Sequence, residues 1–211
     1  MSEDLKSRIA LVFRAEVAET GFNHVSVVHL MKKSGIRRQT FYDNFQDKYD
    51  LLGYTIQAMM EADVESNIDR LDWEEIIAQV FYSAELNRDF YKSVYSSQKE
   101  IDVIGEISRH ITVLLRKIIK EEGMADNHRA SNFVTVFSIG LTYTMIDNLF
   151  SHHPLDYDVI ADRVNSALHF TLSNHTSEEQ TFFPCPLETC SLCFKRVFVC
   201  GRGRREALNR Q

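Results

Sequence analysis

Residues 27–52 constrain the fold more than any other stretch, because their pattern is that of two short helices, a tight turn between them and a third helix. Their apolar positions recur at the spacing of one helix face; these are Val27, Leu30, Met31, Phe41 and Phe45. Ser26 precedes the first helix as an N-cap, and Gly35 follows it, where a helix end favours left-handed backbone. Asp47 can cap the third helix. The stretch predicts a helix-turn-helix over a small apolar base.

The second short helix begins with four polar or cationic residues, which are Arg37, Arg38, Gln39 and Thr40. In a helix-turn-helix, the N-terminal side chains of the second helix enter the major groove. Arginine can bind guanine, and glutamine can bind adenine, through paired hydrogen bonds, whereas threonine can reach a thymine methyl group or a phosphate. These residues predict a surface that binds double-stranded DNA. The alternative is an ordinary helical hairpin whose charged side chains are only solvated.

The run GIRRQTFYDNFQDKYDLL, residues 35–52, resembles the DNA-binding domain of TetR-family transcriptional regulators. The positions that carry the resemblance are Gly35, Thr40, Phe41, Tyr42, Phe45 and Lys48. The sequence of the second short helix is most similar to that of the Firmicutes branch of dihydroxyacetone-kinase-operon activators. The resemblance is confined to the N-terminal part of the chain, and it implies a regulator that binds an operator in double-stranded DNA.

The resemblance also implies roles for single residues. Thr40, Tyr42 and Lys48 match positions that commonly contact DNA phosphates, and the side chains of residues 37–39 match positions that face base edges. Arg37 stands where the family commonly has a capping serine, which leaves that cap open. The predicted DNA-binding residues are Ser26, Arg37, Arg38, Gln39, Thr40, Tyr42 and Lys48.

The whole chain has the composition of an all-α protein. It has 211 residues, of which 44% are hydrophobic, enough for one sizeable core or two small ones. Only 3 Pro and 8 Gly occur, and the apolar residues recur mostly at helical spacing. With the resemblance, this predicts a TetR-like fold of about nine helices. Residues 1–47 would be the three-helix DNA-binding domain, 48–176 a helical effector and dimerisation domain, and 177–211 an irregular Cys-rich basic tail.

Charge is unevenly distributed along the sequence. The formal net charge is −6, yet residues 1–50 carry 8 Lys and Arg against 7 Asp and Glu. The acidic excess therefore belongs to the remainder, which suits a protein that binds DNA at one end only. No apolar run approaches the roughly 20 residues of a transmembrane helix, and the N-terminus MSEDLKSR lacks the apolar core of a signal peptide. We expect a cytoplasmic protein with no membrane partner.

An aromatic cluster follows the helix that is expected to run over residues 48–67 and to link the DNA-binding domain to the rest of the chain. Because TetR-like regulators hold effectors among the helices of this region, the resemblance implies a pocket for a small organic effector. Its candidate residues are Met59, Phe81, Tyr82, Phe90, Tyr91 and Tyr95. The alternative is that these residues fill the core. Within the same fold, the signal can instead come from a protein coregulator or a metal.

Residues 128–151 and 157–173 are expected to form the last two helices. The first is apolar nearly all round, so two sides need to be covered. Gly140 lies in its middle, where glycine costs about 1 kcal/mol against alanine and a close neighbouring helix would explain it. The resemblance implies a homodimer held by a four-helix bundle of these helices. The candidate interface residues are Phe133, Phe137, Gly140, Leu141, Val164 and Leu168.

No cofactor is predicted, and metal ligands are candidates at two places. The tail holds all 4 cysteines in the pattern C-x4-C-x2-C-x6-C, at Cys185, Cys190, Cys193 and Cys200. Only the central C-x-x-C has the spacing of zinc sites, and a non-native or loosely packed extension is the alternative. His152 and His153 stand close to Asp156 and Asp158, where a solvated loop is the alternative to a metal site. The chain has no Gly-rich phosphate loop and no nucleophile motif, so we expect no enzyme.

Overall fold

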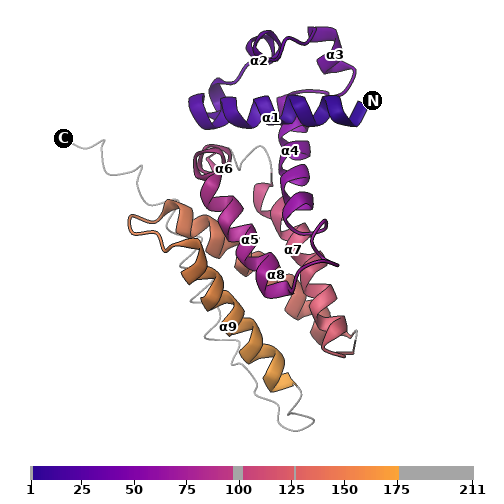
Figure 1. Cartoon of the computed structure of the whole chain (residues 1–211), viewed down its shortest axis with the longest axis vertical. Coiled ribbons are helices and arrows are strands. Elements are labelled where there is room, and N and C mark those ends of the chain that lie inside the picture. Colours follow the sequence, from indigo (N-terminus) through magenta and orange to yellow (C-terminus); the bar gives the residue numbers. More distant parts are fainter. Residues whose placement is uncertain (1, 97–101, 126, 176–211) are drawn as a thin grey trace, which may run out of the picture. The chain divides into compact units, whose positions relative to one another are not determined.

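The computed structural model describes residues 2–96, 102–125 and 127–175 of the chain. Within these ranges the chain forms nine α-helices and one 3₁₀ turn, and no strand (Figure 1). The elements are α1 (Ser2–Thr20), η1 (Phe22–His24), α2 (Val27–Ser34), α3 (Arg38–Tyr42), α4 (Lys48–Asp63), α5 (Trp73–Leu86), α6 (Arg88–Tyr95), α7 (Val103–Glu121), α8 (His128–Phe150) and α9 (Tyr157–His175). The prediction of an all-α fold is confirmed.

The helix-turn-helix is bounded by the local signals that its sequence carries. The Ser26 hydroxyl caps α2 by accepting a hydrogen bond from the His29 N–H at 3.2 Å. Gly35 ends α2 with φ of 67°, the left-handed conformation. The Asp47 carboxylate caps α4 by accepting hydrogen bonds from two backbone N–H groups. α3 has only five residues, and the Arg37 side chain does not cap it.

The head, by which we mean the described residues up to 47, has an aromatic core of its own. Phe13, Phe22 and Phe41 are fully buried, and the Phe41 and Phe45 rings lie 5.7 Å apart. α1 also holds α2 through a buried carboxylate, because Glu16 accepts a 2.6 Å hydrogen bond from Lys33. The carboxylates around Lys33, Glu16 first, raise the pKa of this ammonium, so it stays cationic. This packing fixes the angle at which α3 is presented.

α4 and α6 connect the head to the remaining helices. α4 leaves the head and continues into the body, by which we mean helices α5–α9. There it packs against α5 and α7 (Figure 1). α6 packs against α1 and η1 on one side and against α5 and α8 on the other, and it buries Phe90, Tyr91 and Val94. Residues 1–172 form one compact unit. The predicted domain boundary after residue 47 stays a prediction.

α8 is buried on one side only. Its buried side packs against α7 through the residues Ala130, Val134, Ser138, Thr142, Met145, Ile146 and Leu149. By length and composition alone, α8 would qualify as a membrane span, although its sequence has no unbroken apolar run of that length. Core helices of helical bundles have the same property. The apolar side chains that stay exposed on α8 include Val136 and Ile139, at 67% and 42% exposure.

Candidate functional site

The N-terminal end of α3 presents its side chains to solvent. Arg37, Arg38 and Gln39 are exposed, and Thr40 is half-buried. The Arg38 guanidinium lies over the Tyr42 ring, 5.4 Å from its centre, and donates a 3.4 Å hydrogen bond to the Tyr42 hydroxyl. The Gln39 amide donates to the Asp43 carboxylate at 3.0 Å. Tyr42 and Asp43, each four residues further along the chain, therefore orient the two side chains that are predicted to read bases.

The side chains of Lys48 and Ser26 bond to backbone groups, whereas those of Arg38 and Gln39 bond to other side chains. The Lys48 ammonium donates to the Phe22 carbonyl at 3.2 Å and to the Asn23 carbonyl at 3.5 Å. It also lies 4.6 Å from the centre of the Phe22 ring. An ammonium has three N–H donors, so one donor remains for a phosphate. The Ser26 hydroxyl is the cap of α2, at the exposed edge of the head.

The structure separates the residues of the predicted effector pocket. Phe81, Phe90 and Tyr91 are buried side chains, and Met59 is 8% exposed. Tyr82 instead lies on the outside, with its ring 4.9 Å from that of Tyr157. Tyr95 is half-buried, with its ring 5.4 Å from that of Phe150. The six residues are therefore not gathered around one space.

A small void lies where α5, α7 and α8 meet. Among the six predicted pocket residues, only Phe81 lines it; the other lining residues are Ile77, Val80, Ile107, Ile111, Leu141, Thr142 and Met145. Its volume is about 10 Å³, which is close to the space that one water molecule needs. An organic effector would enter here only if these helices moved apart.

A buried carboxylate lies beside the buried aromatic residues, and the sequence patterns did not point to it. Asp63 is 8% exposed and accepts a hydrogen bond from the Gln79 amide at 3.4 Å. Burial raises the pKa of Asp63, although hydrogen bonds from Ser83 and Gln79 and the charge of Arg14 oppose this. Burial also raises the pKa of the Tyr91 hydroxyl. The available signal was an aspartate within the apolar stripe that ends α4.

The raised pKa of Asp63 makes the stability of the folded chain depend on pH. The folded chain binds this proton more tightly than the unfolded chain does, so stability falls as the pH rises from the unfolded pKa through the raised folded pKa. Asp63→Asn has no proton to lose there. We expect the free energy of unfolding of the variant, measured in urea, to rise relative to that of the unchanged chain between about pH 4 and pH 7.

Asp69→Asn is the matched control for Asp63→Asn, because the Asp69 side chain is 92% exposed and its loss removes the same charge. A difference between Asp63→Asn and the unchanged chain that is the same at every pH would contradict the burial argument.

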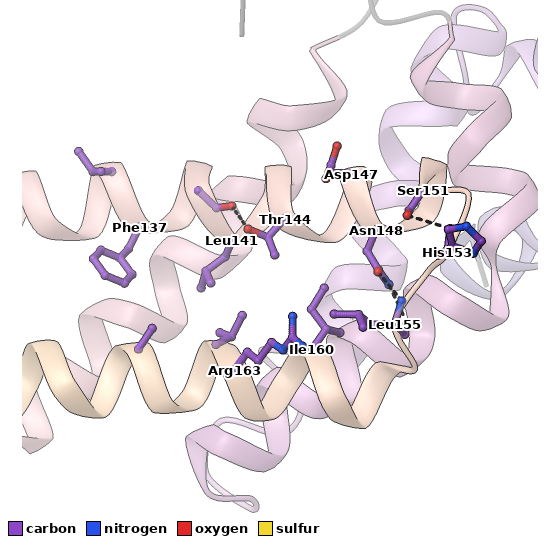
Figure 2. Close-up of a pocket in the computed structure, with 14 residues that line it drawn as sticks. Phe137, Leu141, Thr144, Asp147, Asn148, Ser151, His153, Leu155, Ile160 and Arg163 are labelled. Atoms are coloured by element: carbon purple, nitrogen blue, oxygen red, sulfur yellow. Dashed lines mark hydrogen bonds between the residues drawn. The ribbon is translucent and has the colours of Figure 1, made fainter. Parts of the chain in front are cut away.

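An open groove of about 710 Å³ runs between α8 and α9 (Figure 2). The residues that line it are Val136, Phe137, Gly140, Leu141, Thr144, Asp147, Asn148, Ser151, His153, Leu155, Ile160, Arg163, Val164 and Ala167. The loop between the two helices is fixed by Asn148, whose side chain both accepts from and donates to the backbone of Leu155, at 2.9 and 3.0 Å. The two helices are thereby held as the walls of one groove.

Four of the six predicted interface residues line this groove, namely Phe137, Gly140, Leu141 and Val164. Phe133 is half-buried with its ring 4.4 Å from that of Phe137, and Leu168 is fully buried. Figure 2 shows Phe137 and Leu141 directed into the groove from α8, with Ile160 and Arg163 on the α9 side. A Cβ atom built on Gly140 would meet no atom within 4 Å beyond its chain neighbours and the nearby backbone of α8. Gly140 is therefore open to whatever covers the groove.

The metal candidates are not gathered into a site within the part of the chain that is described. No three His, Cys, Asp or Glu side chains come together there in a way that would hold a metal ion. His152 and His153 lie in the exposed loop after α8. Cys185, Cys190, Cys193 and Cys200, with the whole predicted tail, lie outside the described residues.

Comparisons with known proteins find relatives of the C-terminal region and of the whole fold. The family model of a TetR-type transcriptional regulator C-terminal region matches residues 72–170. The HTH-type dhaKLM operon transcriptional activator DhaS of Lactococcus lactis is 25% identical over 120 residues, which are 57% of this chain and 64% of the activator. The chain thus spans less than two thirds of that relative.

Solved structures show the same fold. The dihydroxyacetone kinase operon activator DhaS superposes with a TM-score of 0.69 at 17% identity, covering 80% of this chain and 96% of that one. FadR from Bacillus subtilis, solved in complex with stearoyl-CoA, has a TM-score of 0.53 at 16% identity, covering 77% and 96%. The match over residues 72–170, the DhaS relative and the shared fold thus agree with the resemblance of residues 35–52 to TetR-family transcriptional regulators.

Proposed function

We propose that the chain acts as a homodimer that reads a palindromic operator with α3 of each subunit and is controlled through its C-terminal helices. The observation that carries the proposal is the exposed end of α3, where Arg37, Arg38 and Gln39 face solvent on a rigid, capped helix-turn-helix. The relatives are regulators of transcription, and no catalytic step is proposed.

Each α3 reads few bases, because it is only five residues long. Arg38 and Gln39 are the side chains placed to form paired hydrogen bonds with guanine and adenine. Thr40, Tyr42 and Lys48 flank them as phosphate contacts, which position the helix without specifying sequence. Two such helices about 34–36 Å apart match successive major grooves on one face of a duplex. Specificity at the scale of a genome therefore needs the dimer.

The α8–α9 groove is the surface that we assign to the second subunit. It leaves Val136 exposed and Phe137 only half-buried, and a second copy would cover both. Two-fold symmetry places the same groove on both subunits. Asp147 on α8 and Arg163 on α9 also line it, so each subunit brings both charges to the interface.

Control is proposed to pass through α4 and α6, which join the head to the body. In its crystal structure, the relative FadR is in complex with stearoyl-CoA. A small organic effector of this chain would have to part α5, α7 and α8, since the void there holds about 10 Å³. A ligand that binds one arrangement of these helices better than another shifts DNA affinity by that difference. A protein coregulator and a metal remain the alternatives, and the comparisons do not favour either.

Selection of DNA from the chain's own genome tests the proposal. Purified protein is incubated with genomic fragments, and the retained fragments are sequenced. We expect enrichment of one inverted repeat whose half-sites lie on the same face of the duplex. The matched control is the triple variant Arg37→Ala, Arg38→Ala, Gln39→Ala, which alters exposed side chains only and should enrich nothing. Equal enrichment of all fragments by the unchanged protein would contradict the proposal.

A further inference from the structure

We infer that Ser93 of α6, acting through the Phe22 peptide, positions Lys48 at the DNA-facing side of the head. The inference rests on the proposed function. The Phe22 N–H donates a 2.6 Å hydrogen bond to the Ser93 hydroxyl, and the Phe22 carbonyl accepts a 3.2 Å hydrogen bond from the Lys48 ammonium. One residue in η1 thus links a body helix to the first residue of α4.

The Phe22 link is held rigidly. The Phe22 side chain is 1% exposed, and its ring makes edge contacts with the rings of Phe13 and Tyr49, at centre distances of 6.3 and 5.3 Å. Gly21, just before it, has φ of 87°, and a Cβ atom built there would lie 3.7 Å from the Ser93 hydroxyl oxygen. The turn therefore lies close against α6 in a backbone conformation that favours glycine. A shift of α6 relative to α1 would move the Phe22 carbonyl.

Lys48 depends on that carbonyl for its orientation. Its ammonium is at the end of a flexible four-carbon stem, which the carbonyls of Phe22 and Asn23 and the Phe22 ring hold in one place. Holding the side chain in the bound position lowers the entropy that phosphate binding loses. Without the hydrogen bond to Ser93, the Phe22 peptide loses its tie to α6, and the ammonium that its carbonyl holds is positioned less closely. Ser93 is thus a positioning residue that does not itself touch DNA.

A double-mutant cycle on operator affinity tests the inference in the full-length protein. We expect Ser93→Ala to weaken operator binding about tenfold, the effect of losing one hydrogen bond between Lys48 and a charged phosphate, and to lower the salt slope by about 1. In the Lys48→Ala background, Ser93→Ala should have no further effect, because the two residues act through the same contact. Ser93→Thr keeps the hydroxyl and should restore affinity.

Two controls make the outcome decisive. Ser96→Ala removes an exposed hydroxyl at the end of α6, which donates to the carbonyl of Lys92 at 2.9 Å, and should leave affinity and salt slope unchanged. Should Ser93→Ala fail to fold, as judged by circular dichroism, the cycle is run with Ser93→Cys, whose thiol is a weaker acceptor.

The inference and the proposed function fail in different ways. If the unchanged protein binds no duplex, the proposed function is wrong. If the unchanged protein binds its operator and the effects of Ser93→Ala and Lys48→Ala simply add, the proposed function stands and Ser93 does not position Lys48. Normal operator affinity in Ser93→Ala would overturn the inference in the same way.

Discussion

Replacing Gly140 with arginine is expected to dissociate the dimer while each subunit stays folded. In the single subunit, a Cβ atom built on Gly140 has no atom within 4 Å beyond its chain neighbours and the nearby backbone of its own helix, and a glycine in a helix interior costs about 1 kcal/mol against alanine. The subunit therefore has room for a side chain here. In the proposed dimer, the partner subunit covers this position. An unpaired buried charge costs about 3–5 kcal/mol, so the dimer should weaken at least 100-fold.

Gly53→Arg is the matched control for this substitution. Gly53 also lies in a helix interior, and a Cβ atom built on it also meets no atom within 4 Å, but it is on α4, away from the groove. Sedimentation equilibrium should give the Gly53→Arg variant the dimer dissociation constant of the unchanged protein. If Gly140→Arg dimerises as tightly as the unchanged protein, the α8–α9 groove is not the subunit interface.

Arg38→Ala is expected to lower discrimination between the operator and single-base variants by about 1–3 kcal/mol at one position, roughly 5- to 150-fold. Arg38 is exposed, and its partner Tyr42 is 46% exposed on the same helix. The free energy of unfolding should therefore change little. The loss comes from the two N–H groups that the guanidinium would donate to guanine in the major groove.

Competition binding against a panel of operator variants measures this loss. Lys48→Ala is the informative comparison, because a lost phosphate contact weakens binding to every duplex alike and lowers the salt slope by about 1. The two variants should thus differ in kind, one in selectivity and the other in overall affinity. If Arg38→Ala keeps the full selectivity of the unchanged protein, Arg38 does not read a base.

The elements of the head could be predicted from the sequence because local interactions define them. The Ser26 and Asp47 caps and the left-handed Gly35 are each settled within a few residues. α3 ends at Tyr42, so Phe45 packs from the following turn and not from the helix. The short helix still places Phe41 and Phe45 together, because the spacing of four persists across the turn.

The interior of the body was harder to predict. Helix periodicity predicted the apolar stripes that carry Leu141 and Val164, which line the α8–α9 groove, but it could not tell which neighbour each aromatic side chain would meet. Tyr82 faces Tyr157, far along the chain. The hydrogen bond between Phe22 and Ser93 joins residues 71 positions apart. Such contacts depend on how whole helices pack against one another, which the period of a single helix does not record.

Hydroxyl-radical footprinting of the full-length protein on its selected operator tests most directly the claim that a dimer presents two α3 helices to one duplex. We expect two protected regions on the same face of the DNA, centred about one helical turn or 34–36 Å apart, with two subunits bound per operator by analytical ultracentrifugation. A single protected region held by one subunit would contradict this account.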